Sequence, residues 1–194
     1  MQKSAHALAS RPPDPKPAAG VDNLFLREEQ MRHAQDLLFF AYRDFTAAAD
    51  VILEERALGR AHHRAIHFIG RQPGITVGDL LTILRITKQS LARVLSTLVE
   101  QNLVALAPGR SDRRQRLLTL TEQGRALERR LFESQRDRLA AAYREAGGAS
   151  VDGFRRVMRA IMDTGARAVL DQVGVRGAHD QVGARGAHDK QPIP

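Results

Sequence analysis

The sequence predicts a mainly helical protein that carries one small β-hairpin. Aromatic residues make up only 5% of the 194 residues and tryptophan is absent, so the core must consist mainly of aliphatic side chains. That composition suits helices packed on helices better than a β-sandwich, which favours β-branched and aromatic residues. Long segments with helical spacing of apolar residues flank a single pair of short strand candidates. We therefore expect long helices at both ends of the folded region, with short helices and a hairpin between them.

The two ends of the chain differ in composition from its middle. Residues 1–22 contain the proline-rich run RPPDPKPAAG and are expected to form a disordered arm. Residues 171–194 contain a nine-residue tandem repeat, QVGVRGAHD followed by QVGARGAHD. Two copies cannot build a solenoid, so we expect a flexible tail there. One folded domain is expected over residues 23–170.

Positive charge is concentrated in the centre of the chain. The segment from Arg60 to Leu118 holds ten Lys or Arg and three acidic residues, so it carries +7 of the formal net charge of +8. A scatter of solvated basic residues would spread this excess more evenly. The concentration predicts a polyanionic partner.

The composition also argues against several classes of protein. Because there is no cysteine, disulfides and thiolate metal sites are excluded. No stretch approaches the ~20 apolar residues that cross a bilayer, and the first residues lack the apolar run of a signal peptide. No glycine-rich phosphate loop or nucleophile elbow is present. We expect a cytoplasmic protein that is not an enzyme, needs no cofactor and does not contact a membrane.

A long helix is expected from Asn23 to Glu55, with apolar residues three and four positions apart on one face. The members of this stripe are Met31, Ala34, Leu38, Ala41, Phe45, Ala48 and Ile52. Phe39 and Phe40 lie on other faces, and a helix that is apolar on more than one side usually packs between two partners. In a chain this small, we expect the second partner to be another subunit.

Three shorter helices are expected next. The first covers His62–Gly70 and ends at the breaker QPG. The second begins after Thr76, which can cap the free amide groups of its first turn. A tight connection leads to Thr87, which caps the third helix, Lys88–Gln101.

The helix Lys88–Gln101 has one apolar face and one face rich in hydrogen-bonding groups. The apolar face carries Leu91, Val94, Leu95 and Leu98, and the opposite face carries Gln89, Arg93, Ser96, Thr97 and Glu100. Arg can pair with guanine, Gln with adenine, and Ser with either. Any amphipathic surface helix has a polar face, so this observation alone leaves a solvated surface and a DNA-reading surface equally open.

A hairpin candidate tipped with arginines follows at once. Leu103–Ala107 and Arg114–Leu120 have strand character and are separated by the turn PGRSD. A helix pair followed by such a hairpin is the plan of a winged helix-turn-helix. In that plan a recognition helix enters the major groove, and the wing lies against the backbone or in a minor groove. The hairpin therefore favours DNA reading over a solvated surface.

Two further helices are expected after the hairpin, from Thr121 to Ala146 and, beyond Gly147 and Gly148, through a last stripe. The stripe contains Phe154, Val157, Met158, Ile161 and Ala168. These helices flank the DNA-reading unit without belonging to it, which suits dimerisation.

The stretch from about Asn23 to Leu170 resembles the MarR family of bacterial regulators. The specific part is DRRQRLLTLTEQG at residues 112–124, which is similar to the family's wing signature of Asp-Arg-Arg, a strand and Leu-Thr-x-x-Gly. ITKQSL at 86–91 and LVEQNLV at 98–104 resemble its recognition helix and the exit from it. Asn102 stands where the family usually has Gly, and Asn also tolerates the left-handed conformation of a helix end. The run between His62 and Leu81 looks closest to the branch called PetP.

The resemblance implies a homodimer, with dimerisation helices over residues 23–58 and 122–170 and a winged helix-turn-helix over 60–121. It implies a recognition helix from each subunit in successive major grooves of a pseudo-palindromic double-stranded operator, with half-site centres about 10 bp apart. It also implies that Asp112 holds Arg114 ready for the minor groove. The expected DNA-binding residues are Thr87, Lys88, Gln89, Ser90, Arg93, Ser96, Thr97, Arg110, Asp112, Arg113, Arg114 and Arg116.

Many members of the family respond to small aromatic or anionic ligands bound between the dimerisation and DNA-reading regions. The resemblance therefore implies a site for a small-molecule effector, and the sequence does not identify the ligand.

Three histidines leave an alternative function open, that of a metal-responsive regulator or metalloprotein using His62, His63 and His67. His63 and His67 are four apart on a helix and can share one ion. No Glu follows His63, so the HExxH arrangement of metalloproteases is absent. In the simpler interpretation one His packs at the helix start and the others face solvent or DNA phosphates. We expect no metal site.

Overall fold

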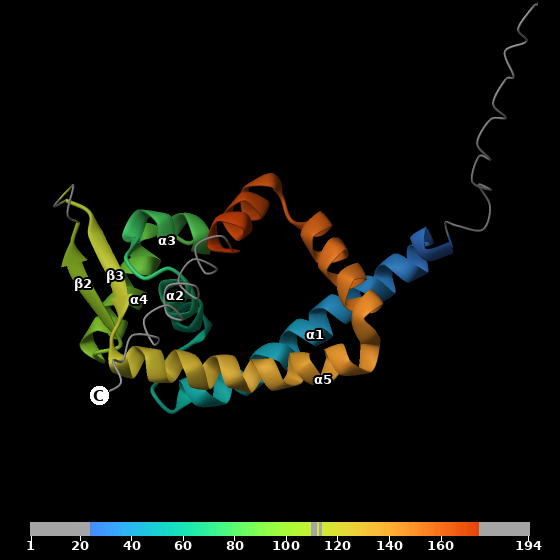
Figure 1. Ribbon diagram of the computed structural model, residues 1–194, viewed down its shortest axis with the longest axis horizontal. Coiled ribbons are helices and arrows are strands. Elements are labelled where there is room, and N and C mark those ends of the chain that lie inside the picture. The colour runs from blue at the N-terminus through green and yellow to red at the C-terminus, as the bar shows by residue number, and fades with distance from the viewer. Residues whose placement is uncertain (1–23, 110–111, 113, 175–194) are drawn as a thin grey trace, which may run out of the picture. The chain divides into compact units, whose positions relative to one another are not determined.

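The computed structural model describes residues 24–109, 112 and 114–174 (Figure 1). Contacts within the chain divide it into two units, Met1–Arg43 and Asp44–Pro194. The expected proline-rich arm lies outside the described residues. So does the tandem repeat, except for the first residues of its first copy. Within the described ranges, no helix is long and apolar enough to span a membrane.

Helix α1, Glu28–Glu54, follows a short 3-10 turn at Leu24–Leu26. Its buried residues are Thr46, Ala49 and Leu53, all in the second unit. The first members of the predicted stripe, such as Met31, are exposed in the single chain, so the expectation that this face packs against another subunit stays a prediction. The helix is buried only where Ala49 and Leu53 join the core of the second unit.

Helices α2, Arg60–Arg71, α3, Val77–Leu84, and α4, Lys88–Glu100, follow the predicted order. The Thr76 hydroxyl accepts a hydrogen bond from the Asp79 amide at 3.0 Å, and the Thr87 hydroxyl accepts one from the Ser90 amide at 3.1 Å. Both predicted N-caps are thus confirmed. Each cap satisfies an amide that the first turn leaves without a partner.

The hairpin consists of β2, Val104–Pro108, and β3, Arg116–Leu120, paired antiparallel with Val104 opposite Leu120. A third strand, β1 at Ile75–Thr76, pairs with the other edge of β3 and gives the order β1-β3-β2. The two-stranded hairpin that we predicted is therefore incomplete. Two residues are too short to show strand alternation, and Thr76 also carries the capping signal of α3.

The core of the second unit is aliphatic, as the composition predicts. It joins all three short helices to the sheet, and its largest fully buried side chains are Leu53, Ile66, Ile69, Leu80, Leu91, Leu98, Leu103, Leu118 and Leu131. Burying one such side chain stabilises a fold by roughly 1.5–3 kcal/mol. This core fixes the position of α4 and of the strand pair.

Helix α5, Glu122–Ile161, begins after the N-cap Thr121 and is interrupted at Gly147, which has φ +76°. The interruption confirms the break expected at Gly147 and Gly148. A separate helical segment covers residues 164–174 (Figure 1). The prediction of one last helix through Ala168 is wrong, because the Asp163 carboxylate starts this new segment by accepting the Ala166 amide at 2.7 Å. Residues 171–174, expected in the tail, are helical.

Candidate nucleic-acid interface

Helix α4 separates an apolar face from a polar one. Leu91, Val94, Leu95 and Leu98 are buried, whereas Gln89, Arg93 and Ser96 are exposed. The helix is held to the core on one side and presents an amide and a guanidinium on the other. These are the groups that read base edges in a major groove.

The hydroxyl groups of α4 are engaged locally. The Thr87 hydroxyl caps the helix and donates to the Ser90 hydroxyl at 2.9 Å. The Ser96 hydroxyl donates to the Glu100 carboxylate at 2.7 Å, and the Thr97 hydroxyl donates to the Arg93 carbonyl at 3.2 Å. Four predicted DNA-binding residues thus also have local hydrogen bonds, of which the sequence analysis predicted only the cap by Thr87.

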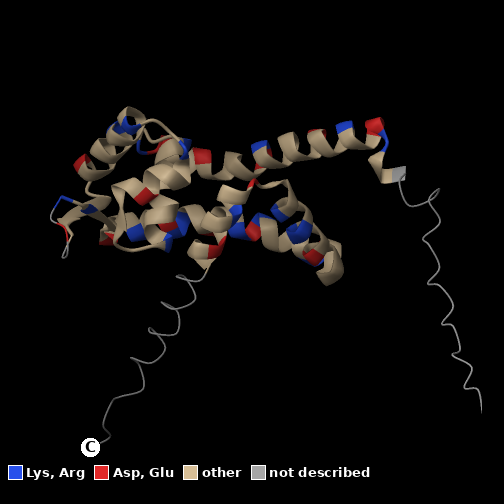
Figure 2. Cartoon of the chain, turned by 90° about the horizontal axis from the view of Figure 1, so that it is seen from above, with Lys and Arg blue, Asp and Glu red and all other residues tan. Residues whose placement is uncertain are grey.

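Cations are available at this face. Within the described part of the chain, Lys88, Arg93, Arg114 and Arg116 form no ion pair, whereas other arginines do. The Arg60 guanidinium pairs with Asp50 at 2.7 Å, and that of Arg130 pairs with Glu55 at 3.1 Å. Figure 2 shows basic and acidic residues interleaved along the helices. Unpaired guanidinium and ammonium groups keep their full attraction for phosphate.

Hydrogen bonds connect the described residues on the two sides of the hairpin turn. The Gly109 amide donates to the Gln115 carbonyl at 2.9 Å, and the Gln115 amide donates to the Asp112 carbonyl at 3.1 Å. Gly109 is required there, since an added Cβ would lie 2.6 Å from the Asp112 carbonyl oxygen. The predicted site residues Arg110 and Arg113 lie outside the described residues.

Asp112 and Arg114 are linked in a way that the sequence analysis did not expect. The Asp112 carboxylate accepts a hydrogen bond from the Arg114 backbone amide at 2.9 Å. In the described part of the chain it makes no ion pair with the Arg114 guanidinium. The carboxylate therefore shapes the backbone of the turn, as Asp commonly does in Asx turns, and leaves the guanidinium exposed.

The exit of α4 is joined to the start of α5. Asn102 has the left-handed conformation that we predicted, with φ +56°. The Thr121 hydroxyl donates to the Asn102 carbonyl at 2.6 Å, and the Thr121 amide donates to the Leu103 carbonyl at 3.1 Å. The Gly124 amide completes the cap of α5 by donating to the Thr121 hydroxyl at 3.0 Å. The Thr and Gly of Leu-Thr-x-x-Gly thus have a structural role at this junction.

The three histidines lie on helix α2. The His62 ring accepts the Gly59 amide at 3.0 Å and so caps α2. The His67 ring lies edge-on to Phe68, with centroids 5.1 Å apart. No three His, Cys, Asp or Glu among the described residues are placed to hold a metal ion. His62 packs at the helix start as the simpler interpretation expects, whereas His63 and His67 are half-buried and line a cavity instead of facing solvent or DNA phosphates.

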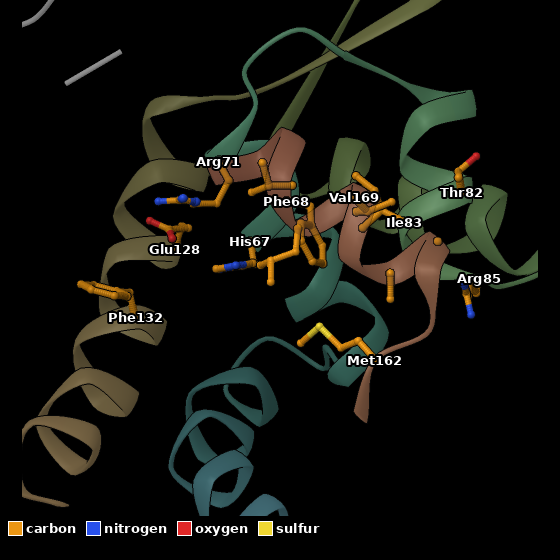
Figure 3. A pocket seen from close by; sticks show the side chains of 15 residues that line it. His67, Phe68, Arg71, Thr82, Ile83, Arg85, Glu128, Phe132, Met162 and Val169 are labelled. Carbon is orange, nitrogen blue, oxygen red and sulfur yellow. The ribbon is translucent and has the colours of Figure 1, made fainter. Parts of the chain in front are cut away.

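A cavity of about 840 Å³ lies between α2, α3, α5 and the segment 164–174. Figure 3 shows its aromatic and aliphatic lining together with several polar side chains. The apolar lining includes Phe68, Ile83, Phe132, Met162 and Val169, and the polar side chains are His67, Arg71, Thr82, Arg85 and Glu128. The volume is in the range of sites for small ligands.

The pKa values of His67 and Glu128, which both line the cavity, are shifted by burial. Burial lowers the pKa of His67 below its ordinary value, and the charges of His63 and Arg71 lower it further. Burial raises the pKa of the Glu128 carboxyl, although Arg129 and Arg71 oppose the shift. Each shift favours the neutral form of the group, as burial does for ionisable side chains.

Comparisons with known proteins agree with this arrangement. The profile described as MarR family matches residues 58–115. The chain is 55% identical over 148 residues to the HTH-type transcriptional regulator PetP of Rhodobacter capsulatus, covering 76% of this chain and 89% of that protein. Its fold is similar to the crystal structure of a MarR family transcription regulator, with a TM-score of 0.62, 17% identity and coverage of 72% and 93% of the two chains.

A mutant MarR from E. coli, complexed with operator DNA, has a similar fold, with a TM-score of 0.56, 18% identity and coverage of 72% and 99% of the two chains. Over the helix pair, the wing signature and the flanking helices, sequence and fold agree. The chain belongs to the MarR family of winged helix-turn-helix transcriptional regulators and is not an enzyme.

Proposed function

We propose that the chain is a homodimeric, sequence-specific regulator that places α4 in the major groove of duplex DNA and its arginine wing in the adjacent minor groove. The observation that carries the proposal is the exposed side of α4, where Gln89 and Arg93 project from a helix whose other side is buried. The E. coli relative complexed with operator DNA supports the same partner. This function places the protein in the bacterial cytoplasm, with the chromosome.

Selection of bound fragments from randomised duplex DNA tests the proposal. We expect a pseudo-palindrome with half-site centres about 10 bp apart. Arg93→Ala and Gln89→Ala should each cost on the order of 1–3 kcal/mol at the selected site and relax its base preference. Lys88→Ala is the matched control, because a phosphate contact near the helix start should weaken binding to all duplexes alike. Equal losses on selected and random DNA for Arg93→Ala would contradict the assignment.

A homodimer is supported by the exposed apolar residues of both flanking regions. In the first unit these include Leu37, Leu38, Phe39 and Tyr42 of α1, and in the second unit Phe154, Val157 and Ile161 of α5. Several large apolar side chains left exposed on one helix are typical of association sites in soluble proteins. Two-fold symmetry of the dimer matches a pseudo-palindromic site.

We also propose that the cavity binds a small aromatic effector. Phe68 and Phe132 offer ring contacts, and Arg71 and Glu128 offer opposite charges to a polar substituent. Benzoate, benzamide and benzylamine share a ring and differ in charge, so calorimetric titration with all three identifies the preferred class. Phe132→Ala should weaken whichever compound binds. No binding by any of the three, or binding that Phe132→Ala leaves unchanged, would argue against an aromatic effector in this cavity.

A further inference from the structure

We infer that Asp163 is a positioning residue for the recognition helix α4. Residues 163–174 form a strap, and this strap holds Asp163 against the helix-turn-helix. The inference concerns a contact within the chain. The inference is tested below by cysteine labelling and by DNA affinity. The DNA-affinity test rests on the proposed function of α4, whereas the labelling test does not.

The contact lies at the corner between α3 and α4. Arg85 ends α3 in a left-handed conformation, with φ +50°, two residues before the cap of α4. The Asp163 carboxylate accepts two hydrogen bonds from the Arg85 guanidinium, at 2.6 and 3.0 Å. Such a bidentate pair fixes direction as well as distance. The residue that turns the chain into α4 is therefore held by a residue 78 positions further along.

Asp163 has two roles at once. Its Oδ1 atom accepts the Ala166 amide at 2.7 Å and so caps the helix 164–174. The hydrogen bonds from Arg85 and from the Ala166 amide lower the pKa of Asp163 to about 2. The carboxylate is thus charged at physiological pH, and the start of the strap coincides with the contact to the corner.

The strap is fixed along its length. The Arg159 guanidinium donates to the Asp171 carboxylate through two bonds of 2.8 Å, and Arg167 donates to the carbonyls of Arg159 and Ala160 at 3.0 and 2.7 Å. Val173 is only 6% exposed. It lines the cavity together with Val169 and with Ile83 of α3, and Figure 3 shows Val169 and Ile83 at this cavity. Polar contacts therefore tie the strap to the end of α5 and, through Asp163, to Arg85 at the end of α3.

The strap does not cover the surface assigned to DNA. The cavity residues opposite it belong to α2, α3 and α5, and the polar side of α4 is exposed with the strap in place. A blocking role is therefore disfavoured, and support of the corner is favoured. Loss of this support should reduce the precision with which α4 meets the bases.

Cysteine labelling tests the strap directly, because the natural chain contains no cysteine. Val173→Cys places a thiol at a buried position of the strap. Gly174→Cys places a thiol at the next position, which is exposed, and is the matched control. The rate of reaction with Ellman's reagent should be slow for Val173→Cys and fast for Gly174→Cys. Circular dichroism establishes that both variants are folded.

Asp163→Asn is the informative second change, because Asn can still cap a helix but cannot form the ion pair. It should raise the labelling rate at Val173→Cys about two- to fivefold, the range for an exposed pair, and leave Gly174→Cys unchanged. Arg85→Gln should have the same effect, and the double variant should exceed neither single one, as a shared pair requires. An unchanged labelling rate in Asp163→Asn would overturn this inference and leave the proposed function untouched.

DNA affinity supplies the second readout. Removing an acid raises net charge and by simple electrostatics strengthens binding to every duplex. A positioning role predicts the opposite sign at the selected site, a weakening of about two- to fivefold, with random duplex bound equally or more tightly. Tighter binding of Asp163→Asn to the selected site would overturn the inference. Failure of the natural chain to prefer any duplex would instead overturn the proposed function, with the strap still measured by labelling.

Discussion

Gly124, in the first turn of α5, lies directly against the carbonyl oxygen of Leu103, so closely that a methyl group on its Cα would overlap that oxygen. Leu103 is fully buried between α4 and β2. The closeness of the two backbones explains why glycine occupies the last position of the wing signature.

Gly124→Ala should destabilise the fold by about 1–3 kcal/mol, because the added Cβ must displace backbone rather than a flexible side chain. Gly148→Ala is the matched control, since no heavy atom lies within 4 Å of an added Cβ there. Alanine at that helical position should be neutral or stabilise by up to about 1 kcal/mol. Urea denaturation measures both, and equal stabilities of the two variants would show that the overlap is relieved cheaply.

Asp112→Ala should weaken binding to the selected site about fivefold, the value of one lost hydrogen bond, because the Arg114 amide loses its partner. Asp112→Asn keeps an acceptor oxygen and removes a negative charge, so it should bind as tightly as the natural chain or more tightly. Adding Asp112→Ala to Arg114→Ala should cost little more, because the backbone that Asp112 holds then no longer presents the Arg114 guanidinium. DNA affinity is measured at fixed salt. Equal losses of affinity in Asp112→Ala and Asp112→Asn would indicate that the Asp112 carboxylate acts through an ion pair with the Arg114 guanidinium.

Acidification should destabilise the protein through His67. Its pKa is lowered in the folded chain, so below about pH 6.5 the unfolded chain binds more protons than the folded one. The stability that depends on neutral His67 is therefore present above the ordinary pKa and is lost as the pH falls towards the lowered one. His67→Gln should show a smaller drop in Tm between pH 7.5 and 5.5, with Glu128 still in place. His62 and His63, whose pKa values are also lowered, will retain part of the slope.

Phe39→Lys should dissociate the homodimer. Phe39 is 73% exposed in the single chain. A symmetric dimer would bury Phe39 of both subunits, so the substitution should remove on the order of 3–6 kcal/mol of association free energy in total. Gln35→Lys, one turn earlier on the same helix, controls for added charge. Sedimentation velocity at micromolar concentration distinguishes the two outcomes, and an intact dimer for Phe39→Lys would remove this side chain from the interface.

The helix order, both threonine caps and the buried face of α4 could be predicted because each depends on residues within one turn of one another. The contact of Asp112 with an amide could not, because a carboxylate next to three arginines suggests an ion pair. β1 was missed because its pairing with β3 depends on residues more than 40 positions away. The contact between Arg85 and Asp163 gives no local signal at all, since it depends on the bend at Gly147.

The junction of Asn102, Leu103 and Thr121 has a mechanical consequence. The hydrogen bonds from Thr121 to the carbonyls of Asn102 and Leu103 join the end of the hairpin to the exit of α4, so the distance between the recognition helix and the wing is set within the chain. In the complex that we propose, the spacing of the two elements is set by this junction, and the duplex supplies the matching twist and groove width. Bases that no side chain touches then influence binding through the stiffness of the DNA between the two elements.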